Sequence, residues 1–133
     1  MRYGRRVVSV NRVFVTLDCA EPQAVAEFWA GLLEGEVVFA TAQAVGVRTA
    51  QLWLTAMRVD GFRPPTWPDD DVPKQIHLDL DVDDLGAAVA DAERLGAVAA
   101  EFQPAPDARR IMLDPAGHPF CLTTGVPKFA SET

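Results

Sequence analysis

The stretch Ile76-His77-Leu78-Asp79-Leu80-Asp81-Val82 repeats the pattern of Val13-Phe14-Val15-Thr16-Leu17-Asp18-Cys19. In both stretches apolar residues alternate with other residues, which is typical of a strand with one buried face. Superimposing them pairs Phe14 with His77, Thr16 with Asp79 and Asp18 with Asp81. An internal repeat of this kind predicts that the chain is built from two copies of one structural unit.

Each of these strands is followed by a segment with helical periodicity. Pro22 suits a first helical position, and the apolar stripe behind it is Val25, Phe28, Trp29, Leu32 and Leu33. In the second copy Asp83 or Asp84 is placed to cap a helix whose stripe is Leu85, Ala88, Val89, Ala92 and Leu95. Gly35 and Gly96 are placed to end the two helices. Three further alternating segments after each helix predict the order βαβββ in both copies.

A proline-rich segment separates the copies. Asp60 to Pro73 holds four prolines and an acidic run, and proline removes backbone donors and fixes φ, so we expect a connector there. This divides a single domain, residues 12–124, into unit one (12–59), a linker (60–74) and unit two (75–124), with terminal extensions at 1–11 and 125–133. Trp67 in the linker either packs over the edge of the core or forms a lid over a pocket.

Composition excludes several classes of protein. The chain has 133 residues, 49% of them hydrophobic and 23% charged, which is typical of one globular domain. A net charge of −7 argues against binding to nucleic acid. We find no apolar run long enough for an export signal or a membrane anchor. Cys19 and Cys121 have no metal-type spacing, so we expect free thiols in a cytoplasmic protein.

The second copy carries the most specific motifs. They are HLDLDVDDL at residues 77–85, and Asp114-Pro115-Ala116-Gly117 followed by His118-Pro119-Phe120-Cys121-Leu122. With the doubled βαβββ order, the chain resembles the vicinal oxygen chelate superfamily, and within it the glyoxalase-like (glyoxalase/bleomycin resistance) proteins of actinobacteria. The resemblance covers about residues 12–124. It implies an α+β fold in which the two units pair into a curved mixed sheet enclosing a cleft, with the helices outside. It also implies a bacterial homodimer, in which the units of two chains can exchange partners.

The resemblance further implies a divalent metal held in the cleft by the first and last strand of each unit. Superimposing the copies places Phe14 and His77 at the first-strand positions, and Trp53 and Cys121 at the last-strand positions. Phe14 and Trp53 cannot ligate a metal, and a catalytic metal needs about three protein ligands. We therefore expect no metal or other cofactor. The alternative is a divalent metal on His77, Asp79 and Cys121, or on His77, Asp79 and His118.

A metal-free pocket for a small molecule suits these residues better. Two aromatic walls with a few polar groups are typical of such pockets. The side chains expected to bind a ligand are Phe14, Thr16, Trp53, Thr55, His77, Asp79, Cys121 and Trp67. Asp18, Asp81 and Thr123 share that inward face. The opposite face, packed under the helices, is Val13, Val15, Leu17, Leu52, Leu54, Ile76, Leu78, Leu80, Phe120 and Leu122. The alternative is that Phe14 and Trp53 fill the interior and leave no cavity.

The chemical roles of single residues stay open at this point. His77 is a buried structural histidine, a catalytic acid or base in a pocket, or a metal ligand. Cys121 is an inert buried thiol, or a nucleophile if its pKa is lowered. Asp18 and Asp81 are expected to cap helices. Arg109 and Arg110 are either both solvated at a sheet edge, or one of them faces inward, toward an anion. The sequence thus favours a small-molecule-binding protein, with a glyoxalase-type lyase, isomerase or dioxygenase using His77 as the alternative.

Overall fold

The computed structural model describes residues 8–124. The parts of the expected terminal extensions at residues 1–7 and 125–133 lie outside the described residues.

The chain folds as two units of the same order. The N-terminal unit contains β1 (Phe14–Cys19), α1 (Pro22–Leu32), β2 (Glu36–Ala40), β3 (Ala44–Arg48) and β4 (Trp53–Arg58). The C-terminal unit contains β5 (Leu78–Asp81), α2 (Leu85–Leu95), β6 (Val98–Ala99), β7 (Arg109–Leu113) and β8 (Pro119–Thr123). Each unit forms a four-stranded mixed sheet, with orders β1-β4-β3-β2 and β5-β8-β7-β6. The predicted α+β fold of two βαβββ units is therefore confirmed.

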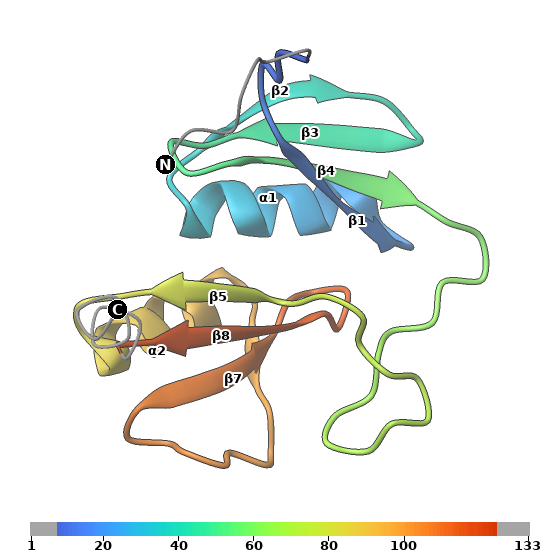
Figure 1. Ribbon diagram of the computed structural model, residues 1–133. Coiled ribbons are helices and arrows are strands. Elements are labelled where there is room, and N and C mark those ends of the chain that lie inside the picture. The colour runs from blue at the N-terminus through green and yellow to red at the C-terminus, as the bar shows by residue number, and fades with distance from the viewer. Residues whose placement is uncertain (1–7, 125–133) are drawn as a thin grey trace.

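The two units share one hydrophobic core. Figure 1 shows α1 lying on the side of its own sheet that faces the C-terminal unit. Trp29 of α1 stacks edge-on against Phe120 of β8, with ring centroids 5.0 Å apart, and Phe28 lies 5.8 Å from the same ring. Aromatic pairs at these separations add to the burial of their apolar area. Contacts between aromatic rings therefore hold the units together across their interface.

The apolar sides of the strands lie where alternation places them, with two exceptions. Eight of the ten residues predicted to pack under the helices are in the core or packed against it: Val15, Leu17, Leu52, Leu54, Leu78, Leu80, Phe120 and Leu122. Val13 and Ile76 are 66% and 81% exposed, so their predicted burial is wrong. The reason is that β1 begins at Phe14 and β5 begins at Leu78, so both residues precede the strands.

The helix ends correct the expected roles of two aspartates. α2 is capped by Asp84, whose side chain accepts a hydrogen bond from the Ala87 N–H at 3.0 Å, and Gly96 ends the helix at φ 119°. α1 begins after Glu21, with no side-chain cap, and Pro22 fills its first turn. Asp18 and Asp81 therefore do not cap helices, because each helix starts well beyond the end of the strand before it.

The strand registers shift the superposition of the two copies by two residues. In the first sheet Thr16 pairs with Thr55, and in the second Asp79 pairs with Cys121. Because Thr16 corresponds to Asp79, the residue equivalent to Cys121 is Thr55, and not Trp53 as the sequence comparison indicated. A shift of two leaves every side chain on its original face, so alternation cannot detect it.

Neither helix in residues 8–124 is long and apolar enough to cross a bilayer.

Candidate functional site

His77, Asp79 and Cys121 meet on one face of the C-terminal sheet. Their possible ligand atoms all lie within 4.8 Å of one another, and His77 Nε2 is 3.4 Å from Asp79 Oδ1. Asp79 and Cys121 are paired across β5 and β8, so the register positions them. The His77 side chain is 37% exposed, which contradicts its interpretation as a buried structural histidine.

Burial raises the pKa of the Cys121 thiol, and the charge and hydrogen bond of Asp79 raise it further. Arg109 and Lys74 act in the opposite direction but do not outweigh these effects. The thiol is therefore protonated near neutral pH. This argues against the nucleophile interpretation, because the thiolate is the reactive form.

A small basic pocket lies beside this cluster. It has a volume of about 130 Å³ and is lined by Trp67, Lys74, His77, Arg109, Ile111, Pro119 and Cys121. Trp67 is held in place by a hydrogen bond from its Nε1 to the Phe102 carbonyl oxygen at 3.3 Å. The Lys74 Nζ lies 4.1 Å from the centre of the Trp67 ring, a cation–π contact. Trp67 thus packs against the linker and Phe102 while also forming one wall of the basic pocket.

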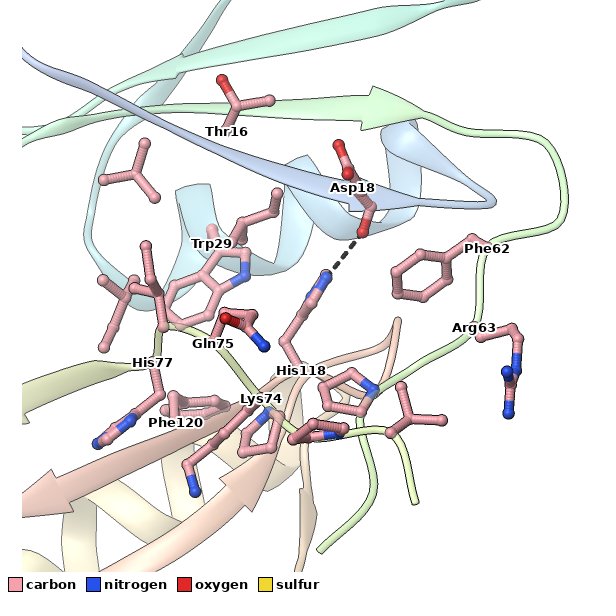
Figure 2. Close-up of a pocket in the computed structure, with 18 residues that line it drawn as sticks. Thr16, Asp18, Trp29, Phe62, Arg63, Lys74, Gln75, His77, His118 and Phe120 are labelled. Carbon is pink, nitrogen blue, oxygen red and sulfur yellow. Dashed lines mark hydrogen bonds between the residues drawn. The ribbon is translucent and has the colours of Figure 1, made fainter. Parts of the chain in front are cut away.

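A larger pocket, the seam pocket, lies between the two units (Figure 2). Its volume is about 300 Å³, and its aromatic walls are Trp29, Phe62 and Phe120. Thr16 and His77, two of the predicted ligand-binding residues, line it from opposite units. Figure 2 shows Lys74 and His77 at one end of this pocket and Arg63 at the other. The basic pocket is also lined by Lys74, His77 and Pro119, so the two pockets adjoin, and together they are called the composite site.

The other predicted aromatic residues form a separate surface on the N-terminal sheet. The Phe14 and Trp53 rings meet edge-on with centroids 5.2 Å apart, and Phe14 is 45% exposed. The Arg12 guanidinium lies 4.6 Å from the centre of the Trp53 ring. Among residues 8–124, neither Phe14 nor Trp53 lines the seam pocket or the basic pocket. The structure therefore does not bring these two aromatic residues to His77 and Cys121. Thr55 is buried in the same sheet.

His118 connects the units at the edge of the seam pocket. Its Nδ1 is 2.7 Å from Asp114 Oδ2, and its Nε2 is 2.7 Å from the Asp18 carbonyl oxygen. Figure 2 shows this second bond and the Asp18 carboxylate turned away from it. Asp114 also accepts a hydrogen bond from Trp29 Nε1 at 2.9 Å. Both ring nitrogens of His118 are thus engaged, so His118 is not available as a metal ligand beside His77.

Among the described residues, the His77 cluster is where a metal of the type that the resemblance implies would bind. His77, Asp79 and Cys121 supply three ligand types in the number that a catalytic site uses. One feature opposes a divalent cation: the positive side chains of Lys74 and Arg109 lie beside the cluster. The N-terminal unit offers Phe14 and Thr55 at the equivalent positions, and phenylalanine cannot ligate. The side chains therefore fit a metal only in part, because all the possible ligands come from the C-terminal unit.

Sequence reasoning missed several residues of the composite site. Lys74, Phe62 and Arg63 come from the linker, and Trp29 was assigned to the core alone. Arg109 was named only as one of two candidates; it lines the basic pocket, while Arg110 donates from Nε to the Pro106 carbonyl oxygen at 2.8 Å. Arg109 could have been found from the sequence, because it lies two residues before Ile111 on the same strand and therefore shares its face. In the sheet it pairs with Thr123. No periodic pattern marks the linker residues.

The chain is similar to known proteins both in sequence and in fold. A family model described as a glyoxalase-like domain matches residues 14–123. The fosfomycin resistance protein FosX from Mesorhizobium loti superimposes with a TM-score of 0.65 at 14% identity, over 92% of this chain and 99% of that chain. No curated protein matches the sequence.

Two further solved structures share the fold. The bleomycin-binding protein from Streptomyces verticillus has a TM-score of 0.57 at 20% identity, over 90% of this chain and 99% of that one. Leishmania major glyoxalase I has a TM-score of 0.63 at 14% identity, over 93% of this chain and 94% of that chain. These likenesses show a shared fold. The family match across both units shows that the chain belongs to the glyoxalase-like domain family.

Proposed function

We propose that this protein binds a small organic molecule, without a metal, in the composite site formed by the seam pocket and the basic pocket. The observation that carries the proposal is the composite site itself: an aromatic-walled cavity of about 300 Å³ that adjoins a polar end at His77. Pockets of this size with apolar walls and a few convergent polar groups are typical of small-molecule sites. The bleomycin-binding protein of Streptomyces verticillus, which shares the fold, was solved with its ligand bound.

Filling the seam pocket should weaken binding. Val72 lines that pocket, and we expect Val72→Trp to weaken ligand binding by on the order of 10-fold or more, because the indole would occupy space that the ligand needs. Val38→Trp, on the exposed strand β2, is the matched control and should bind as the parent does. Ligand-observed NMR with small phenylalkyl acids and amides measures both. Equal loss in the two variants, or none in either, would count against this location.

A metal-dependent lyase, isomerase or dioxygenase is the second candidate. The proximity of His77, Asp79 and Cys121 favours it, and one relative in fold, FosX from Listeria monocytogenes, was solved with Mn(II). If a metal binds here, these three side chains would hold it. It would supply a Lewis acid to polarise a bound oxygen. His77 would then be committed to the metal, and no general base is left beside it in this cluster.

Elemental analysis separates the two candidates. After incubation with Zn, Ni, Mn and Fe(II) followed by gel filtration, we expect well below one metal ion per chain, because two cations adjoin the cluster. Stoichiometric metal that is lost in His77→Ala and retained in Asp81→Asn would establish the second candidate instead. Asp81 is the control because it lies on β5 two residues beyond Asp79, outside the cluster.

We further propose a homodimer in the bacterial cytoplasm. The support is an exposed apolar surface on the N-terminal sheet, where Phe14, Phe39 and Met57 are 45%, 43% and 37% exposed. A second copy covering these side chains would remove them from water. The two cysteines are unpaired, as expected in a reducing compartment. Sedimentation equilibrium giving the monomer mass would contradict the dimer.

A further inference from the structure

We propose that the ligand of the composite site is an organic acid, whose anionic group binds in the basic pocket and whose apolar part lies in the seam pocket. The inference rests on the proposed function and names the chemical class of its ligand. The inference is based on the positive charge of the basic pocket, on the lack of ion pairs and of a thiolate that would neutralise this charge, and on the different linings of the two pockets.

The charge of the basic pocket is opposite to that of the whole protein. The chain has a formal net charge of −7, yet two basic side chains, Lys74 and Arg109, line this small pocket together with His77. The cation–π contact with Trp67 fixes the position of the Lys74 ammonium at the pocket wall. Clustered cations in a partly enclosed space raise the local concentration of anions.

Neither cation is neutralised by a carboxylate of its own. In residues 8–124 the ion pairs are Arg48–Glu36, Arg94–Asp91, His77–Asp79 and His118–Asp114. Asp79 is the one carboxylate of the His77 cluster, and its interactions are with His77 and Cys121. The positive charges of Lys74 and Arg109 therefore exceed the single negative charge of Asp79, and the site has a net positive charge.

The Cys121 thiol adds no negative charge to this balance. Burial and Asp79 keep it protonated, so its part of the pocket lining is neutral. A protonated thiol is compatible with a bound anion, whereas a thiolate would repel one. Electrostatics therefore favour an acid over a neutral or cationic ligand.

The two compartments differ in size and in lining. The basic pocket, at about 130 Å³, accommodates a single acidic group. The seam pocket, at about 300 Å³, presents Trp29, Phe62 and Phe120 to the rest of the molecule. Lys74 and His77 line both compartments, so a ligand that reaches across them contacts both linings at once. This arrangement predicts an amphipathic acid with an aromatic or aliphatic body.

Matched acid and amide pairs test the inference. The probes are benzoate, 3-phenylpropionate and 4-phenylbutyrate, each with its amide, titrated at millimolar concentrations and followed by ligand-observed NMR. We expect at least one acid to bind about 10-fold more tightly than its amide, because hydrogen bonds to charged groups exceed those between neutral groups. Lys74→Gln and Arg109→Gln should each remove most of that preference. Arg109→Lys, which keeps the charge, should retain part of it.

Arg58→Gln is the control, because it removes one positive charge at an exposed position that lines neither pocket. It should leave the preference for the acid unchanged. Amides that bind as tightly as the acids, or an equal loss in Arg58→Gln, would overturn the organic-acid inference while leaving the proposed function standing. Failure of all six probes to bind would overturn both.

Discussion

Replacing Asp114 with alanine is expected to lower the free energy of unfolding by about 3–5 kcal/mol, the usual cost of removing one partner from a buried charged pair. The Asp114 side chain is fully buried and accepts four hydrogen bonds. Two come from side chains, Trp29 Nε1 at 2.9 Å and His118 Nδ1 at 2.7 Å. Two come from the backbone N–H groups of Ala116 and His118, both at 2.9 Å. Alanine would leave all four donors without their acceptor.

The effect should be large because this carboxylate joins the two units. Trp29 lies in α1 of the N-terminal unit, and Asp114 follows β7 of the C-terminal unit. A buried donor without a partner costs about 1–3 kcal/mol by itself. Asp114→Asn keeps the size and one acceptor oxygen, so it should fall between alanine and the parent.

Urea unfolding followed by circular dichroism measures this prediction. Asp107→Ala removes an exposed carboxylate from a turn and should change stability by less than about 0.5 kcal/mol. An Asp114→Ala variant as stable as Asp107→Ala would show that the hydrogen-bonded network contributes little.

The second large effect is a loss of stability on raising the pH, carried by His118. Its Nδ1 faces a carboxylate oxygen and its Nε2 faces a backbone carbonyl oxygen. Both partners only accept hydrogen bonds, so the ring satisfies both only when it carries two protons. Burial lowers the pKa of His118, but the hydrogen bond and charge of Asp114, aided by the carbonyl and charge of Asp18, outweigh it and raise the pKa above 6.5.

The direction of the pH effect follows from this raised pKa. Because the folded protein holds the proton more tightly than the unfolded chain, the stabilisation is fully present below pH 6.5, the usual pKa of histidine. It is lost as the pH rises from there through the pKa of the folded state. One proton is involved, so the slope cannot exceed about 1.4 kcal/mol per pH unit.

Urea unfolding at a series of pH values should show this decline in the parent protein, and His118→Gln should remove it. His77→Gln is the matched control and should leave the decline in place, because His77 lies outside the network. The series should stop below pH 9.0, the usual pKa of cysteine, since burial raises the pKa of both Cys19 and Cys121. A decline of equal slope in His118→Gln would assign it to another group.

The sequence predicts the strands and helices of this protein well because their patterns are local. Alternation identified the buried face of β1, with Val15 and Leu17, and the stripe of α1, with Phe28 and Trp29. The same alternation could not predict the register of β4, since shifting this strand by two residues keeps Trp53 and Thr55 on one face. Register depends on hydrogen bonds between strands distant in the chain.

The site was only partly predictable for the same reason. His77, Asp79 and Cys121 were found because the repeat placed them on equivalent strands. Lys74 and Phe62 were missed, since the linker has no period from which an orientation can be inferred. The prediction that Phe14 and Trp53 share a cleft with His77 depends on how the two units pack, and within one chain their packing keeps these residues apart.

By itself, the sequence determined the doubled βαβββ plan, the family and the absence of metal ligands at Phe14, because side-chain chemistry and alternation are properties of short segments. Only the tertiary structure decided which side chains share a cavity. The packing of Trp29 against Phe120 and Asp114 sets the two units against each other, and the linker then lies along the seam. That arrangement brings Lys74 to Arg109 and His77, because burial of aromatic surface between the units, and no local pattern, fixes their relative position.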